Sequence, residues 1–385
     1  MLRLMPSGGP AVCNIAITNV CNAKCDFCGY AFDKQLVADR RYLGFDDYKA
    51  ALGILHARGV RYLTLTGGEP LLHPRLAEMV AEAVGRGFRP SVVTNGALLP
   101  KRLDALVEAG LRTVFISLDA ADTALHERNR GLTGVCAKIR HCNEALGRRG
   151  VKTIASVTIN KLIGDFRALI DFVEALGFDT VTFSYPKAAA LGSSSMVYSD
   201  SSALIDYAPA ELIAAFEELR ALKGDFAILN PAESLAEMIR HLRGETEIFP
   251  CFGGYKYFYL DWKLDVYRCD FWAEKMGTIG EFADKPFIRD GCTACMSDCY
   301  RDSSVLLHFP VAIGDAIGQI RRGRPDKALA LLATNSNWRS VTALLDGAGT
   351  LSRLARLGRP EGGNRGGTTV DRGLALGRTH TTGAP

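Results

Sequence analysis

The sequence predicts an α/β fold, a partial (βα)6 barrel of TIM-like architecture, and three observations support it. Six short runs rich in β-branched residues recur between residues 13 and 186. Helical patterns separate these runs, and several end at a glycine suited to a helix C-terminal cap. Each strand-helix unit takes about 30 residues, so this segment holds six units rather than eight. Such regular alternation forms right-handed crossovers and therefore a parallel sheet.

The expected strands follow one another at even intervals. They cover residues 13–19, 62–69, 90–96, 113–119, 152–160 and 180–186, with helical patterns at 45–59, 73–87 and 100–110 and, later, at about 209–223 and 231–243. Near-continuous apolar strands fit a sheet covered by helices on one side and by the contents of the barrel on the other.

Composition shifts suggest how the chain is divided. We expect an N-terminal extension (1–12), the barrel core (13–208), a helical connector (209–249), a small β-hairpin domain (250–305), a helical extension (306–350) and a disordered tail (351–385). The end of the tail is rich in glycine, arginine and threonine and lacks periodicity, which is typical of a solvated segment, although such tails can also bind RNA.

Composition also limits the function classes. The 385 residues, 48% of them hydrophobic, can bury a full core, and a net charge of +4 spread along the chain gives little support to nucleic-acid binding. No apolar run reaches the roughly 18 residues of a membrane helix, and the first residues do not form a signal peptide. We therefore expect a cytoplasmic protein. Eleven cysteines in that reducing compartment favour metal or redox chemistry over disulfides.

Three cysteines, Cys21, Cys25 and Cys28, directly follow the first strand. This is the carboxyl end of the barrel, where such folds keep their active sites. Polar residues intervene between the thiols, which disfavours a buried apolar stripe. Three thiolates can hold three irons of a 4Fe-4S cluster and leave the fourth for a ligand, much as catalytic zinc sites keep one open position. A zinc site is the alternative.

The spacing C-x3-C-x2-C, with Phe27 before the third cysteine, resembles the radical S-adenosylmethionine (radical SAM) superfamily. The segment TGGEP at 66–70, which closes the second strand, is similar to the methionine-binding element of that family. The resemblance implies that Gly67 and Gly68 let the backbone approach and that Glu69 binds the amino group of the ligand, a natural pairing of carboxylate and ammonium. A zinc site would leave this element unexplained.

Polar residues also end the later strands, where the family contacts ribose, carboxylate or substrate. Taken singly, each could be an ordinary polar strand end. The cofactor-binding residues that the resemblance implies are Phe27, Gly67, Gly68, Glu69, Pro70, Asn95, Ser117, Asp119 and Asn160. It further implies reductive cleavage of S-adenosylmethionine to a 5'-deoxyadenosyl radical that abstracts hydrogen from a substrate carbon. This chemistry needs a low-potential reductant such as a flavodoxin or ferredoxin.

Five more cysteines fall between residues 251 and 299. Residues 251–272 are expected to form a β-hairpin, which is marginal alone and which a metal could stabilise. Structural zinc is one interpretation. Behind a radical SAM core, however, the layout resembles the SPASM and twitch auxiliary domains. That resemblance implies one auxiliary 4Fe-4S cluster on Cys251, Cys269, Cys292 and Cys295, with Cys299 spare or an alternate ligand.

The chain departs from the full SPASM pattern. It has too few cysteines for two complete four-thiolate clusters, and the turn at 261–265 lacks the glycine common there. A single-cluster, twitch-like domain fits better; its cluster would accept an electron from a substrate radical or anchor the substrate. Asp270 is a candidate base for that radical. Tyr185 and Lys187, just past the sixth strand, could touch substrate or face solvent.

The substrate is predicted less directly. Twelve residues precede Cys13, too few for a leader-peptide recognition domain, so we expect a small molecule: a sugar, aminocyclitol or other natural-product intermediate that is oxidised or rearranged. One alternative is a peptide-modifying enzyme with a separate recognition protein. Others are a zinc-stabilised binding protein on a barrel scaffold and a pure electron carrier.

Overall fold

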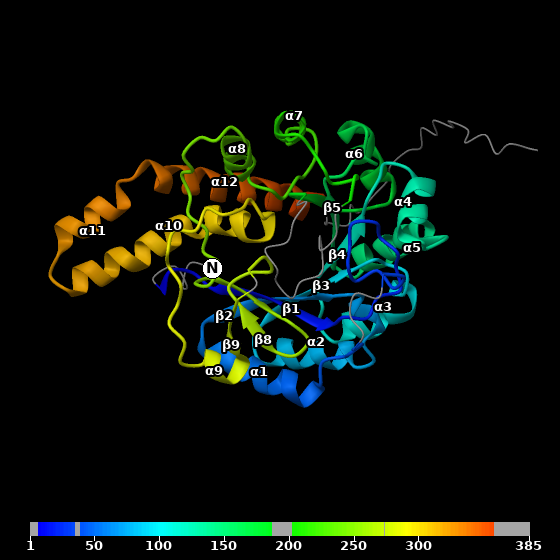
Figure 1. The fold of residues 1–385 in the computed structure, drawn as a ribbon, viewed down its shortest axis with the longest axis horizontal. Helices are drawn as coiled ribbons and strands as arrows, with labels where there is room; N and C mark the ends of the chain where they lie inside the picture. The colour runs from blue at the N-terminus through cyan, green and yellow to red at the C-terminus, as the bar shows by residue number, and fades with distance from the viewer. Residues whose placement is uncertain (1–6, 35–38, 187–201, 273, 358–385) are drawn as a thin grey trace, which may run out of the picture.

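The fold rests on one curved sheet that runs through most of the chain. The computed structural model describes residues 7–34, 39–186, 202–272 and 274–357. In these residues nine strands pair in the order β6-β5-β4-β3-β2-β1-β7-β8-β9 (Figure 1). The first six strands run parallel to their neighbours, which confirms the partial barrel of six βα units.

The barrel strands lie within a few residues of the predicted ranges. They are β1 Ala11–Thr18, β2 Val60–Gly67, β3 Arg89–Thr94, β4 Thr113–Leu118, β5 Lys152–Thr158 and β6 Thr180–Ser184. The intervening helices are α1 Phe45–Ala57, the short η2 Pro70–Leu72, α2 Leu76–Gly85, α3 Leu99–Glu108, α4 Thr123–Arg130, α5 Val135–Arg148 and α6 Phe166–Ala175. Apolar side chains of strands and helices share one buried core, which fixes the curvature of the sheet.

The predicted hairpin is not a lone hairpin. It consists of β7 Tyr257–Leu260 and β8 Asp265–Tyr267, followed by β9 Lys275–Thr278 and the one-turn α9 Ile279–Phe282. β7 pairs in parallel with β1, with Val12 opposite Tyr257, so the hairpin continues the barrel sheet. The backbone groups at the open edge of β1 are thereby satisfied. This pairing adds stability that a lone hairpin of this length would lack.

The turn that lacks glycine uses a leucine instead. Leu264 has φ 63° and is the one non-glycine residue with positive φ in the described part of the chain. The left-handed conformation costs about 1 kcal/mol for such a residue. Leu264 is 7% exposed and belongs to the main apolar core, so burial of its side chain offsets this strain.

Helices form the remainder of the described chain. Two precede the hairpin, α7 Pro209–Leu222 and α8 Ala232–Leu242, and three follow it, α10 Asp298–Arg321, α11 Pro325–Leu332 and α12 Asn335–Leu357. α10 begins earlier than the expected boundary at 305/306, which falls inside it. α12 includes residues 351–357 of the expected tail, and the rest of that tail lies outside the described residues.

α10 has a further property. Within the described residues it is the one helix long and apolar enough, by length and composition, to cross a membrane. Core helices of proteins that never enter a membrane meet the same test. Here α10 packs against α11 and α12 (Figure 1), and its side chain Arg301 is 1% exposed.

Candidate functional site

A cavity of about 400 Å³ opens inside the curved sheet. Cys21, Cys25 and Cys28 line it together with side chains from every barrel strand. The strands contribute a row of hydroxyl groups: Thr64, Thr66, Thr94, Ser117, Ser156, Thr158, Thr182 and Ser184. These hydroxyl groups can exchange hydrogen bonds with a ligand, and apolar side chains such as Val93, Phe115 and Leu229 line the cavity beside them.

The three thiols lie close together in the loop after β1. Cys25 is buried, and the N–H of Cys28 donates to the carbonyl of Cys25 at 3.3 Å. Burial raises the pKa of all three thiols, that of Cys21 to about 12, and neighbouring thiols add to the rise at Cys21 and Cys28. A buried group of this kind becomes thiolate when a cation or metal offsets its charge.

Arg130, at the end of α4, supplies positive charge beside these thiols. Its charge lowers the pKa of Cys21 and Cys25 against the effect of burial. The side chain is 9% exposed, and its Nη2 donates to Asp119 Oδ1 at 2.6 Å. Its Nε has no hydrogen-bond partner in the described residues, although Arg130 lines the cavity. Arg130 thus places a buried positive charge at the cavity wall, close to the thiols.

The two glycines of the TGGEP segment let two protein backbones approach each other. A Cβ on Gly67 would lie 2.1 Å from the carbonyl oxygen of Thr18, and one on Gly68 would lie 2.2 Å from that of Val20. The N–H of Gly68 donates to Thr18 at 2.9 Å. The glycines thus hold the end of β2 against the segment that leads into Cys21, and both also line the cavity.

Glu69 joins the ends of β2 and β3. Its carboxylate accepts the N–H of Leu71 at 2.9 Å, the hydroxyl of Thr94 at 2.6 Å and the N–H of Asn95 at 2.7 Å. Burial nevertheless raises its pKa, and the residue is 1% exposed. Glu69 lines the cavity, so its hydrogen bonds fix the cavity wall where β2 and β3 end.

The structure separates the other cofactor-binding candidates into two groups. Asn95 and Ser117 line the cavity. Asp119 and Asn160 are buried behind the wall: Asp119 pairs with Arg130, and Asn160 Nδ2 donates to the carbonyl of Asp119 at 2.9 Å. Neither residue is among those that line the cavity, and their hydrogen bonds support the loops at the strand ends. Pro70 opens η2 and is buried.

Phe27 and a tyrosine pair connect the thiol loop to the second cysteine region. Phe27 lines the cavity and packs in one apolar cluster with Cys269 and Tyr300. The hydroxyl groups of Tyr30 and Tyr259 lie 3.3 Å apart. The loop that carries the three thiols is therefore held by β7 as well as by β2.

Four of the five later cysteines gather, and we call Cys251, Cys269, Cys292 and Cys295 the auxiliary cysteines. The N–H of Cys251 donates to the carbonyl of Cys292 at 2.9 Å. The charges of Cys295 and Cys292 raise the pKa of Cys251, and that of Cys295 raises the pKa of Cys269, although burial is the larger cause in both. Cys299 is exposed and lines the main cavity instead.

Neither thiol group is already arranged around a single metal ion in the described residues. In the described chain no three side chains of His, Cys, Asp or Glu converge on one point as a single metal ion requires. Zinc binds thiolates at about 2.3 Å, which brings the sulfurs nearly into contact. A 4Fe-4S cluster is wider and holds each thiolate on a separate iron.

Carboxylates from α10 form the cavity wall beside β6. Asp298 accepts the hydroxyl of Ser184 at 3.2 Å, and Asp302 accepts Asn230 Nδ2 at 2.7 Å. Burial and the charge of Asp298 raise the pKa of Asp302 to about 7. Asp270 also lines the cavity, as its candidate role as a base requires. The sequence interpretation missed both α10 carboxylates because it began that helix too late.

The remaining candidates lie elsewhere. Tyr185 lines a second cavity of about 320 Å³ and stacks on Phe216, and Lys187 lies outside the described residues. Two further cysteines, Cys136 and Cys142, are buried on α5.

Comparisons with known proteins agree with this site. Residues 15–174 match the family model of the radical SAM superfamily. The GTP 3',8-cyclase of Chlorobaculum tepidum is 38% identical over 122 residues, which cover 30% of this chain and 36% of the relative. The S-adenosylmethionine-dependent nucleotide dehydratase of a Thermoplasmatales archaeon is 32% identical over 163 residues, which cover 42% of this chain and 57% of the relative. The chain thus spans between about a third and three fifths of these relatives.

A solved structure extends the likeness beyond the barrel. Native anSMEcpe with bound AdoMet superposes with a TM-score of 0.52 at 16% identity, covering 91% of this chain and 99% of that one. At that identity the likeness shows a shared fold. The family match, together with the parallel half-barrel and the three-cysteine loop at its mouth, identifies residues 15–174 as a radical SAM domain.

Proposed function

We propose that this chain reductively cleaves S-adenosylmethionine and abstracts a hydrogen atom from a carbon of a small polar substrate. The observation that carries the proposal is a single cavity that unites three thiols, Glu69, Arg130 and a row of strand hydroxyls. When bound on Cys21, Cys25 and Cys28, a 4Fe-4S cluster supplies the electron that turns S-adenosylmethionine into methionine and a 5'-deoxyadenosyl radical.

The residues of the cavity have complementary tasks. Arg130 has a free Nε for the carboxylate of S-adenosylmethionine, and Glu69 offers its carboxylate to the ammonium group. Asn95 and Ser117 lie on the same wall and can bind the ribose. The enclosing strands keep the substrate carbon close to the reactive group and limit the access of water.

The wall beside β6 favours a polyhydroxylated substrate that carries an amine. Hydroxyl side chains exchange hydrogen bonds with substrate hydroxyls, and Asp298 and Asp302 attract an ammonium group. Among the described residues that line the cavity, Arg130 is the one lysine or arginine. Sugars and aminocyclitols fit this charge pattern, and oxidation or rearrangement is the expected outcome.

A nucleotide substrate is the second candidate, because the two relatives are named for GTP and for a nucleotide. Its phosphates would approach the carboxylates of α10, a helix that lies outside the matched residues 15–174. Like charges in such a cavity repel, so we rank a triphosphate below an amine. A peptide substrate with a separate recognition protein stays an alternative.

The remaining parts of the proposal concern electron flow. The auxiliary cysteines would hold a second 4Fe-4S cluster, which would supply an acceptor for the electron of the substrate radical, and Asp270 could accept the proton released. A flavodoxin or ferredoxin would supply the first electron, which agrees with a cytoplasmic setting.

Anaerobic reconstitution with iron and sulfide tests the proposal. A brown protein that forms 5'-deoxyadenosine from S-adenosylmethionine and dithionite is the expected result, and Cys25→Ala should abolish the product. An amine-bearing cyclitol such as 2-deoxystreptamine should raise its rate of formation more than GTP does. A colourless zinc protein that forms no 5'-deoxyadenosine would reject the proposal.

A further inference from the structure

The first turns of α10 hold the backbone beside two auxiliary cysteines. The hydroxyl of Tyr300 accepts the N–H of Asp270, the residue after one auxiliary cysteine, at 2.9 Å. The hydroxyl of Ser304 accepts the N–H of Phe252, the residue after the auxiliary cysteine Cys251, at 2.8 Å. The backbone segments around Phe252 and Asp270 lie on either side of the hairpin. Hydrogen bonds from α10 therefore hold both segments next to the same helix.

Arg301, between these two residues, reaches a third auxiliary cysteine. It is 1% exposed and the largest of the fully buried side chains. Its Nη1 donates to the carbonyl of Cys292 at 3.4 Å, and the same carbonyl accepts the N–H of Cys251. The charge of Arg301 also lowers the pKa of Cys251, against the larger effect of burial. Arg301 therefore interacts with the auxiliary cysteines in two ways, through a hydrogen bond to the Cys292 carbonyl and through its positive charge.

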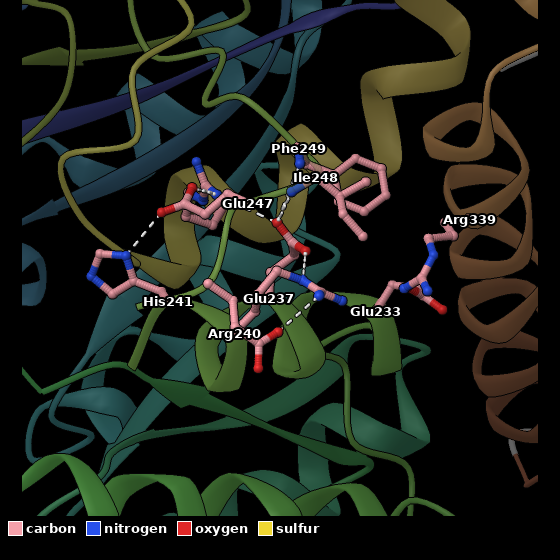
Figure 2. Close-up of polar contacts among 10 residues, drawn as sticks. Glu233, Glu237, Arg240, His241, Glu247, Ile248, Phe249 and Arg339 are labelled. Carbon is pink, nitrogen blue, oxygen red and sulfur yellow. Dashed lines mark hydrogen bonds and ion pairs between the residues drawn. The ribbon is translucent and has the colours of Figure 1, made fainter. Parts of the chain in front are cut away.

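Two buried carboxylates hold this guanidinium in place. Arg301 forms an ion pair with Glu247, and its Nη2 lies 3.9 Å from Glu237 Oε2. Glu237 also accepts the N–H groups of Ile248 and Phe249 at 2.8 and 3.2 Å (Figure 2). These residues lead directly into the first auxiliary cysteine. The two carboxylates thus hold both Arg301 and the backbone segment that leads to Cys251.

Outer contacts complete the arrangement. Arg240 donates to Glu237 at 3.0 Å, and His241 pairs with Glu247 at 2.8 Å (Figure 2). Neither carboxylate is left as an isolated buried charge.

Stability alone is a weak reason for such a buried group of charges. The desolvation of buried ions offsets much of their attraction, and well-packed apolar residues often replace them without loss. An iron-sulfur cluster on four thiolates is anionic, however, and nearby charge and hydrogen bonds set its reduction potential. A fixed guanidinium beside the auxiliary cysteines would offset this negative charge and so influence the reduction potential.

We propose that Arg301 is a positioning residue of the auxiliary site, which orders Cys251 and Cys292 and offsets the negative charge of the cluster they hold. Tyr300 and Ser304 order the neighbouring backbone from the same helix. The proposal rests on the proposed function only in taking the auxiliary cysteines as cluster ligands. It makes no use of S-adenosylmethionine.

The test therefore uses the full chain in which Cys21, Cys25 and Cys28 are replaced by alanine. Iron bound by this protein must lie on other cysteines, so a failure of S-adenosylmethionine cleavage cannot affect the result. Iron and sulfide per chain, the EPR signal of the reduced cluster and its midpoint potential are measured. If this protein binds no cluster, the proposal is overturned at once.

In that background, Arg301→Gln should shift the potential to more negative values and lower the iron content, because two carboxylates lose their counter-charge. Arg301→Lys keeps the positive charge, so its midpoint potential should stay close to that of the parent protein with Arg301. Arg339→Gln is the matched control: it breaks the pair with Glu233 (3.0 Å) that joins α12 to α8 at a half-exposed position (Figure 2). This control should leave both readings unchanged.

A milder variant covers the case in which Arg301→Gln does not fold. Tyr300→Phe removes only the hydroxyl that accepts the Asp270 N–H, and it should shorten the half-life of cluster iron in the presence of a chelator several-fold. A cluster-iron half-life in the Tyr300→Phe protein equal to that in the Arg339→Gln protein would overturn the proposal. So would an equal potential in a folded Arg301→Gln protein.

Discussion

Arg130 and Asp119 form a buried ion pair at 2.6 Å directly behind the three-thiol loop. Asp119 uses its second oxygen to accept Asn129 Nδ2 at 2.9 Å. The pair aims the guanidinium at the thiols and leaves its Nε unused in the described structure. The aspartate thus helps to hold the arginine side chain in place.

Arg130→Gln is expected to weaken the binding of S-adenosylmethionine by about 10- to 100-fold, the value of a lost charge-assisted hydrogen bond. Calorimetry on reconstituted protein measures the effect. Arg128→Gln, on the exposed face of the same helix, is the control and should bind normally. Equal affinities for the two variants would remove Arg130 from the ligand site.

Gly68→Ala should disrupt the thiol loop, because its Cβ would lie 2.2 Å from the carbonyl oxygen of Val20. The backbone there must move, so we expect a loss of stability of about 3 kcal/mol or more together with loss of cluster iron. Thermal unfolding and iron analysis measure both. Gly85→Ala, which meets no atom within 4 Å and lies in α2, should lower neither. A Gly68→Ala protein with normal iron content would contradict the packing argument.

Asp302 should make stability depend on pH. Burial raises its pKa to about 7 in the folded chain, against about 4 in an unfolded chain. Between these values the folded state binds the proton more tightly, so stability falls as pH rises from about 4 to about 7 and then levels off. Asp302→Asn cannot ionise and should gain stability over the natural chain by a few kcal/mol at pH 8 and by much less at pH 5. Urea unfolding at both pH values measures this, and an equal difference at the two would contradict it.

The cysteines should differ in their effect on iron. Cys299 lies in the main cavity, apart from the auxiliary cysteines, so Cys299→Ser should keep the iron content of the natural chain. The Cys269→Ser protein should contain less iron than the natural chain, by about the amount that one cluster holds. Quantitative iron and sulfide analysis compares them. Loss of iron in the Cys299→Ser protein would return this residue to the ligand set.

Local patterns predicted the barrel well. Strands and helices of β1 to β6 show in the sequence because each has its own apolar periodicity, and Cys21, Cys25 and Cys28 share one short loop. The sequence also showed two local features without their explanation. These were the turn near Leu264 that lacks a glycine and the position of Asp270 next to a cysteine. Their explanation required the packing around them.

Long-range relationships could not be predicted in this way. The pairing of β7 with β1 joins segments far apart in the chain, and neither strand carries a signal that names its partner. Arg130 looks like an ordinary helix residue until the fold places it behind the thiols. The start of α10 was missed because cysteines and small polar residues obscure its periodicity.

The most direct test of the account is the EPR spectrum of the dithionite-reduced, oxygen-free protein in which the auxiliary cysteines are replaced by serine. The account predicts the signal of one reduced 4Fe-4S cluster, altered when S-adenosylmethionine is added and absent after the further change Cys25→Ala. A spectrum without such a cluster, or one that S-adenosylmethionine leaves unchanged, would contradict the account.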